Sequence, residues 1–225
     1  MSGVPLPRHP RLISLEGGEG AGKTTAIEAI HACLAAHGHE VVLTREPGGT
    51  PLAERIRALV LGGQSGADEV EPPVAQAELL LVFAARAQHV QRQVLPALAR
   101  GAYVVSDRFT DSSYAYQGAG RGLDPAWIAE LERRVVGVQP GLTLLLDVDV
   151  RIGRARAAGR DLFPDRIERE QDAFFERVRQ AFRQRAEADP QRFRLIDAAQ
   201  PAPGVVADVA AQVEAFLART QEGRA

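Results

Sequence analysis

A glycine-rich run near the N-terminus constrains the fold of this 225-residue chain more than any other feature. Residues 17–24 read Gly-Gly-Glu-Gly-Ala-Gly-Lys-Thr, with a strand-like apolar segment before them (11–16) and a segment of helical periodicity after them (24–36). Glycines let successive backbone N–H groups turn toward one point, and a helix N-terminus adds partial positive charge there. The run therefore predicts a strand–loop–helix unit that binds phosphate groups.

The spacing of this run is that of the P-loop, G-x-x-x-x-G-K-[ST], which predicts binding of a nucleoside triphosphate. We expect Lys23 to contact the β- and γ-phosphates and the Thr24 hydroxyl to ligate Mg²⁺. Lys23 is the only lysine in the chain, where every other basic residue except histidine is arginine, so position 23 has a specific need for lysine. The expected ATP cradle consists of Gly17, Gly18, Glu19, Gly20, Ala21, Gly22, Lys23, Thr24 and Thr25.

Short apolar segments alternate with longer helix-period segments along the rest of the chain. This alternation predicts βαβ units and a mainly parallel sheet in one α/β domain spanning residues 1–225, with residues 1–10 as a flexible lead-in. Strands are expected at residues 11–16, 40–44, 102–106, 142–148 and 193–197. Helices are expected at residues 24–36, 51–61, 74–100, 124–136, 151–158, 167–188 and 204–219.

Composition excludes several classes of protein. The net charge of −2 gives no global basic field for nucleic acid or an anionic membrane. No apolar run reaches the roughly 20 residues of a membrane helix, and residues 1–10 do not resemble a secretory signal. The single cysteine, Cys33, cannot form an internal disulfide, which favours a reducing, cytoplasmic location.

The absence of asparagine narrows the choice among nucleotide-binding proteins. Guanine-specific switches read their base through an N-K-x-D segment, and protein kinases need a catalytic-loop asparagine, so both classes are excluded. An ATPase that couples hydrolysis to motion and a small phosphotransferase remain. The length favours the phosphotransferase, because little chain is left for a mechanical domain.

Polar segments follow the expected strands, at the edge where ligands bind in open α/β sheets. Arg45-Glu-Pro-Gly-Gly-Thr50 follows one strand, and Asp107-Arg108, Ser112 and Ala115-Tyr-Gln-Gly118 follow another. Together with residues 17–25, Ala84-Ala-Arg86 and Asp165-Arg-Ile-Glu168, these segments resemble bacterial thymidylate kinases in sequence and in order. The resemblance implies a three-layer P-loop kinase fold with a five-stranded parallel sheet and a small lid at about residues 151–169.

The same resemblance implies transfer of the γ-phosphate of ATP to dTMP, giving dTDP and ADP for dTTP supply, with Mg²⁺ and as a homodimer. The chemistry agrees with the residues. A nucleoside monophosphate is largely a dianion at pH 7, so its attacking oxygen needs no general base. Two unit charges 4 Å apart repel by about 4 kcal/mol at an effective dielectric constant of 20, so catalysis depends on positioning and cationic clamps.

The family pattern assigns roles to three arginines. Arg45 and Arg108 would hold the acceptor phosphate as bidentate forks, although surface pairs with Glu46 or Asp107 remain an alternative. Arg86 would lie near the acceptor nucleotide, and an ordinary exposed helix arginine is the alternative.

Four polar residues receive roles in the same way. Asp107 would order Mg²⁺ or its waters, with capping of the following helix as the alternative. Glu19 would reach the deoxyribose 3′-OH of the acceptor. Ser113 and Gln117 lie one helical turn apart and would recognise the thymine base. The alternative is that both are solvent-exposed polar residues on a helix.

One position departs from the family pattern. The family stacks thymine on a phenylalanine four residues before the helix arginine, but Val82 stands there and the aromatic residue is Phe83. A shift of one position turns a side chain by about 100° around a helix. Either Val82 forms a looser apolar wall or a local bulge turns Phe83 toward the base, and Phe83 in the core is equally compatible with the sequence.

The lid segment is rich in arginine: Arg151, Arg154, Arg156, Arg160, Arg166 and Arg169. In one subclass of the family the P-loop lacks an arginine, as here, and the lid supplies a catalytic one on closure. We favour Arg160 and then Arg156 for this role, with a solvated helix face as the alternative. Asp147, at a strand end, ranks below Asp107 for contact with a metal-bound water.

Two other functions remain open from the sequence. Another small-molecule kinase would differ in nucleotide selectivity, but a nucleoside kinase needs a base, and the cationic pair Arg45 and Arg108 argues for a phosphorylated acceptor. A non-catalytic ATP-dependent switch would show ligand-dependent partner binding and no acceptor-dependent release of ADP.

Overall fold

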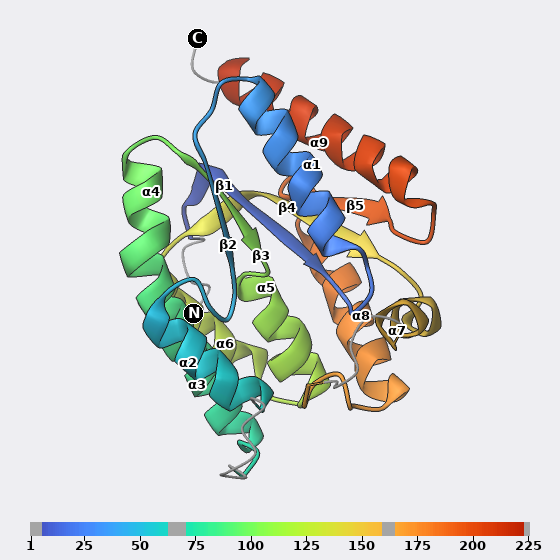
Figure 1. Ribbon diagram of the computed structural model, residues 1–225. Helices are drawn as coiled ribbons and strands as arrows, with labels where there is room; N and C mark the ends of the chain where they lie inside the picture. Colours follow the sequence, from blue (N-terminus) through green and yellow to red (C-terminus); the bar gives the residue numbers. More distant parts are fainter. Residues whose placement is uncertain (1–5, 63–70, 159–164, 223–225) are drawn as a thin grey trace.

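A five-stranded parallel sheet forms the centre of the computed structural model, which describes residues 6–62, 71–158 and 165–222 (Figure 1). The strand order is β2-β3-β1-β4-β5, so the strand that leads into the P-loop is the middle one. Each pair of neighbouring strands runs parallel, which confirms the expected parallel sheet. The strands are β1 (Arg8–Gly17), β2 (Val41–Arg45), β3 (Tyr103–Asp107), β4 (Gln139–Asp147) and β5 (Phe193–Asp197).

Strand β1 begins earlier than the sequence predicts. Arg8 pairs with Gln139 of β4, so residues 8–10 of the expected lead-in belong to the sheet. The register shifts between His9 and Ile13, where Pro10 interrupts the ladder because proline has no backbone N–H to donate.

Helices α1 (Lys23–Ala36) and α9 (Ala202–Glu222) pack side by side on one face of the sheet (Figure 1). Their apolar faces contribute Ile30, Leu34, Val209 and Val213 to one core cluster with the strands. Because α1 starts directly from the glycine loop, its first turn faces the carboxyl edge of the sheet.

The remaining helices cover the other face and the carboxyl edge. They are α2 (Pro51–Leu61), α3 (Ala75–His89), α4 (Leu95–Ala99), α5 (Thr110–Ser113), α6 (Pro125–Leu131), α7 (Val150–Ala158) and α8 (Asp172–Ala188). Wider, π-helical turns at Val90–Val94, Tyr114–Gly120 and Glu132–Val136 extend α3, α5 and α6. The first of these lies just before Pro96, which cannot donate a helical hydrogen bond.

Helix α8 begins at Asp172, five residues after the predicted start. The Asp165 carboxylate accepts the backbone N–H groups of Ile167 and Glu168 at 2.8 and 2.9 Å. These bonds close a turn that competes with the helix, which is why the predicted helical start at residue 167 is wrong. None of the helices in the described ranges combines the length and apolar character needed to cross a bilayer.

Candidate active site

The glycine run forms a tight loop from β1 into α1, as the sequence predicts. Gly20 and Gly22 adopt positive φ angles of 66° and 87°. A Cβ on Gly20 would lie 1.9 Å from the Gly153 carbonyl oxygen of α7, so the loop and that helix meet backbone to backbone. The Lys23 ammonium donates to the Gly18 carbonyl at 3.1 Å, while Thr24 and Thr25 are exposed in the first turn of α1.

Arg108 joins the end of β3 to this loop. Its guanidinium donates to the Gly17 carbonyl at 3.0 Å, to Ser112 Oγ at 3.3 Å and to Glu19 Oε1 at 3.2 Å. It also stacks on the Tyr116 ring, 4.9 Å from the centroid. The backbone φ of Arg108 is +68°, the only positive value among the described non-glycine residues.

Glu16 holds the backbone turn after Arg108, a role that sequence reasoning missed. Its carboxylate accepts the Phe109 N–H at 2.7 Å and the Ser112 hydroxyl at 2.6 Å, and the side chain is fully buried. Burial, together with the negative charge of Asp111, raises the pKa of Glu16 to about 8. The only sequence signal was an acidic residue at the end of the mainly apolar segment 11–16.

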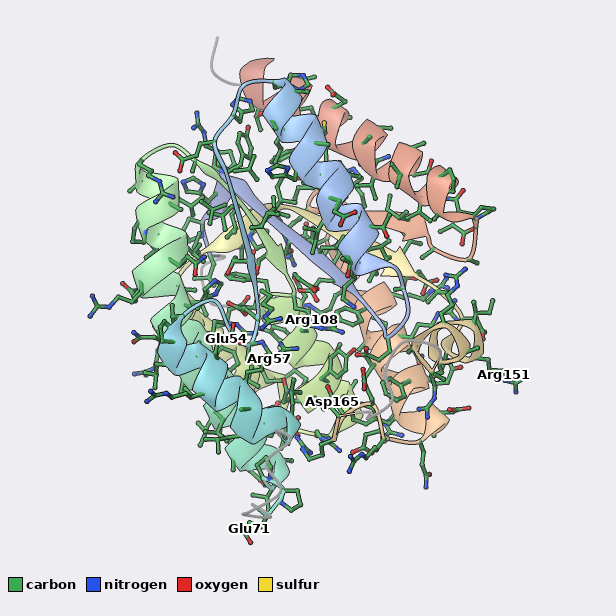
Figure 2. All side chains as sticks on the ribbon, viewed as in Figure 1. Glu54, Arg57, Glu71, Arg108, Arg151 and Asp165 are labelled. Atoms are coloured by element: carbon green, nitrogen blue, oxygen red, sulfur yellow. The ribbon has the colours of Figure 1, made fainter. Side chains whose placement is uncertain are left out.

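A cavity of about 200 Å³ opens beside the loop and brings together most of the predicted acceptor residues. Its lining includes Glu19, Lys23, Val82, Arg86, Asp107, Arg108, Ser113 and Gln117. Arg57, Tyr116 and Asp165 complete the wall, and Figure 2 shows Arg57, Arg108 and Asp165 around the same space. Arg57 and Tyr116 were not predicted.

Arg86 is buried rather than exposed, so the alternative of an ordinary surface arginine is wrong. Its guanidinium donates to Glu46 Oε2 at 2.5 Å, to Ser113 Oγ at 2.9 Å and to the Phe109 carbonyl at 3.1 Å. Glu46 also contacts His89 Nδ1 at 2.9 Å. Although burial alone would raise the pKa of Glu46, Arg86 and His89 outweigh it and lower the pKa.

Helix α3 decides between the two readings of Val82 and Phe83. The helix is regular from Ala75 to His89, so no bulge turns Phe83 toward the cavity. Val82 lines the cavity, whereas Phe83 packs in the core, with the Arg86 guanidinium 4.6 Å from its ring centroid. The wall at this position is therefore aliphatic.

Arg45 does not reach the cavity lining. Its guanidinium pairs with Glu54 at 3.0 Å and its side chain is 55% exposed, so neither the predicted place nor the suggested partner Glu46 is observed. Arg57 takes the place at the cavity wall and donates to the Pro47 carbonyl at 3.0 Å. Burial is the main cause of a lowered pKa for Arg57, and the nearby charges of Arg45 and Arg108 act in the same direction.

Gln117 and Ser113 are buried, so the alternative that both are solvent-exposed polar residues on a helix is wrong. The Gln117 amide nitrogen donates to Glu78 Oε1 at 2.8 Å. Glu78 is fully buried and also pairs with Arg121 at 3.2 Å and with Arg166 from the lid segment.

The other lid arginines lie in different surroundings. Arg156 donates to the Ala198 and Ala199 carbonyls at 2.6 and 3.2 Å. It lies beside a second cavity of about 350 Å³ that Gly20, Gly22 and Thr25 also line.

Two further lid arginines line neither of these two cavities. Arg154 pairs with Asp172 at 3.1 Å, and Arg151 is exposed at the edge of the molecule (Figure 2). Arg160 lies outside the described residues.

Asp107 carries the feature expected of a metal-site carboxylate. Its Oδ1 atom is buried and has no hydrogen-bond partner among the described residues. Asp147, the weaker candidate, instead pairs with Arg179 at 2.7 Å and Arg183 at 3.2 Å. An unpartnered carboxylate oxygen near the Lys23 end of the cavity fits a hard, oxygen-seeking cation such as Mg²⁺.

Known proteins are similar to this chain in sequence and in fold. A family model described as thymidylate kinase matches residues 15–209. The chain belongs to the thymidylate kinase family. A thymidylate kinase of Pseudomonas putida (strain GB-1) is 55% identical over 208 residues, 92% of this chain and 96% of that protein. One of Alkalilimnicola ehrlichii is 54% identical over 87% of this chain and 88% of its own length. The crystal structure of thymidylate kinase from Ehrlichia chaffeensis matches with a TM-score of 0.71 and 31% identity, covering 92% of this chain and all of that chain.

Proposed function

We propose that this protein transfers the γ-phosphate of ATP to dTMP, giving dTDP and ADP. The observation that carries the proposal is the cavity beside the glycine loop, where Lys23, Arg57 and Arg108 gather positive charge opposite a buried amide, Gln117. Membership of the thymidylate kinase family supports it.

Positive charge at one end of the cavity suits the acceptor phosphate. Arg108, the residue after β3, and Arg57 of α2 line this end of the cavity. Arg45 lies outside the cavity lining, and its positive charge acts on Arg57. A phosphate dianion attacks without a general base, so these guanidinium groups act by holding two anions together against their repulsion. Glu19, paired with Arg108 at 3.2 Å, would accept the sugar 3′-OH.

The orientation of Gln117 favours a thymine-like base. Because Glu78 binds the amide nitrogen of Gln117, the amide oxygen remains as an acceptor for a pyrimidine N3–H. Thymine and uracil carry a hydrogen on N3, whereas cytosine presents a lone pair there and would face another acceptor. Val82 supplies an apolar wall, and we assign to it contact with the face of the base.

The donor nucleotide is assigned to the loop and the second cavity. The 350 Å³ cavity beside Thr25 and Arg156 would hold the adenosine part of ATP. Thr24 and Asp107 would hold Mg²⁺, which neutralises charge on the transferring phosphoryl group when it is bound. The roles of Arg160 as a catalytic lid residue, of the homodimer and of a cytoplasmic location remain predictions from the sequence.

The decisive experiment measures ADP release with ATP, Mg²⁺ and a panel of acceptors: dTMP, dUMP, dCMP and UMP. We expect turnover to be fastest with dTMP and slowest with dCMP, and Lys23→Ala to abolish it. Equal rates with all acceptors would defeat the thymine assignment and favour a kinase of another selectivity. ADP release that does not depend on an acceptor would defeat the kinase assignment.

The role of Arg57 has a matched control on the same helix. Arg57→Ala should raise KM for dTMP by about 10–100-fold, since a hydrogen bond to a charged group contributes about 1.5–3 kcal/mol. Arg55, two residues earlier on α2, is exposed, and Arg55→Ala should leave KM unchanged. Equal effects of the two variants would remove Arg57 from the acceptor site.

A further inference from the structure

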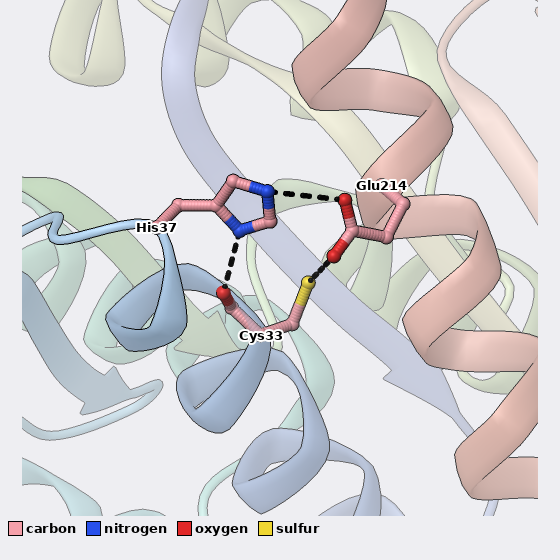
Figure 3. A group of neighbouring side chains, drawn as sticks. All are labelled: Cys33, His37 and Glu214. Carbon is pink, nitrogen blue, oxygen red and sulfur yellow. Dashed lines mark hydrogen bonds and ion pairs between the residues drawn. The ribbon is translucent and has the colours of Figure 1, made fainter.

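A cysteine, a histidine and a glutamate meet on the outer surface of the layer formed by α1 and α9. Cys33 and His37 come from the C-terminal end of α1, and Glu214 comes from α9 (Figure 3). Cys33 is ten residues along the chain from Lys23, about 15 Å along a helix of 1.5 Å rise, so the group is separate from the phosphate loop. We propose that these three side chains form a binding site for a divalent transition metal ion of the zinc type.

The spacing of the ligands comes from helix geometry. Cys33 and His37 are four residues apart, which places both side chains on one face of α1, toward α9. Glu214 Oε1 lies 3.2 Å from Cys33 Sγ, and Glu214 Oε2 lies 3.2 Å from His37 Nε2. All three ligand atoms lie within 4.8 Å of one another.

The contacts of His37 leave one ring nitrogen facing Glu214. His37 Nδ1 lies 3.0 Å from the Cys33 carbonyl oxygen, which only accepts, so Nδ1 carries a hydrogen. Nε2 lies 3.2 Å from a carboxylate oxygen of Glu214. A metal ion bound at Nε2 would take the place of a proton in joining the ring to this carboxylate.

This arrangement also supplies the orienting contact that metal-bound histidines usually have. A ligating imidazole commonly donates its other N–H to a backbone carbonyl, which fixes the ring and its lone pair. His37 makes this contact within its own helix. The coordinating nitrogen is therefore positioned before any ion arrives.

The chemistry of the donor set selects the ion. Zinc takes sulfur at about 2.3 Å and nitrogen or oxygen at about 2.0–2.2 Å in tetrahedral geometry, so its ligand atoms lie about 3.5 Å apart. Cys33 Sγ and His37 Nε2 each lie 3.2 Å from a different oxygen of Glu214, and one ligand atom from each residue lies within 4.8 Å of the others, so side-chain rotation would bring the three to this separation around an ion. Mg²⁺ prefers oxygen ligands only, so this site would not compete with the phosphate site for it.

The site has room for a fourth ligand and a path for entry. The side chains of His37 and Glu214 are 37% and 52% exposed, and Cys33 is half-buried. A water molecule would complete the coordination. Since the ligands come from α1 and α9, a bound ion would cross-link the two helices and stabilise the folded protein by mass action.

The test uses Co²⁺ as a spectroscopic probe on full-length protein that has been stripped with a chelator and kept reduced. We expect one Co²⁺ per chain, with a thiolate-to-cobalt charge-transfer band and the intense d–d bands of tetrahedral cobalt, both removed by Zn²⁺. Cys33→Ser should abolish the charge-transfer band. His37→Gln and Glu214→Gln should each weaken binding at least about tenfold, since each removes one of three protein ligands.

The control is His31→Gln, which changes another exposed histidine of α1, two residues before Cys33. It should bind Co²⁺ as the parent protein does. In the parent protein Zn²⁺ should also raise the Tm, and in Cys33→Ser it should not, which gives a readout that does not depend on colour. Absence of the charge-transfer band at micromolar Co²⁺, or equal weakening by His31→Gln and His37→Gln, would overturn the proposal.

Discussion

Buried acidic side chains organise the candidate site at the scale of the residue. Glu16, Glu46 and Glu78 are each almost completely buried, and each holds a residue of the cavity wall or the backbone beside it. Buried carboxylates of this kind persist only where hydrogen bonds or opposite charges compensate for lost hydration. The side chains that would touch the substrate are thus fixed by acidic residues behind them.

The raised pKa of Glu16 predicts a pH dependence of stability. Because the folded-state pKa is about 8 and the ordinary value is 4.5, the folded protein holds this proton more tightly. Its contribution to the free energy of unfolding is full below about pH 4.5 and is lost as the pH rises through 8, by at most about 1.4 kcal/mol per pH unit. Glu16→Gln should lack this loss in urea unfolding across that range.

Glu130→Gln is the control for this experiment. Glu130 is exposed, and hydrogen bonds from Arg133 and Arg134 lower its pKa, so it does not titrate between pH 5 and 8. The stability of this variant should follow that of the parent protein across the window. Parallel curves for Glu16→Gln and the parent would contradict the raised pKa.

At the scale of the element, helix α3 determines how the base is held. Val82 faces the cavity and Phe83 faces the core, because the helix is regular across both. Val82→Phe should place a ring where the base would stack, at a gain of about 0.5–1.5 kcal/mol, and lower KM for dTMP by about 2–10-fold. Val82→Leu adds bulk without a ring and should not lower it, so similar KM values for the two variants would rule out stacking.

The glycine loop and α7 form a second pair of elements whose contact can be tested. A Cβ on Gly20 would overlap the Gly153 carbonyl, and the φ of +66° disfavours any other residue. Gly20→Ala should therefore lower the Tm clearly, because a backbone atom cannot move aside cheaply. Gly18→Ala is the control for thermal unfolding, since no atom lies within 4 Å of its Cβ position. Equal shifts in the two variants would contradict a close contact.

Much of the fold could be predicted because apolar periodicity marks strands and helices locally. The start of α8 could not, because the Asp165 side chain caps a turn there. The sequence places Ser113 on a helix, but not the bonds of Ser112 and Ser113 to Glu16 and Arg86 from distant segments. Local propensity does not contain these tertiary contacts.

The residues of the candidate site also divide into those that the sequence could predict and those that it could not. Asp107 ends strand β3 and Arg108 and Gln117 follow it, and the sequence places such residues at the ligand edge of the sheet. The place of Arg57 at the cavity wall depends instead on how α2 packs against α3, which only the packed structure shows.

At the scale of the whole molecule, strand order brings the reacting groups together. Because β1 lies between β3 and β4, Arg108 and the glycine loop are neighbours, and the two cavities open along the same edge. With a net charge of −2 the molecule as a whole does not attract anions, so binding of the acceptor phosphate depends on individual cations of the cavity wall such as Arg57 and Arg108.

The left-handed backbone at Arg108 has a consequence for stability. Such a conformation costs a side-chain-bearing residue about 1–3 kcal/mol, and glycine avoids that penalty. Glycine would also remove the hydrogen bonds of the guanidinium to Gly17, Ser112 and Glu19, so relief of backbone strain and loss of contacts would act on the free energy of unfolding in opposite directions. The strained turn is therefore held in place by contacts of the same side chain that would bind the acceptor phosphate.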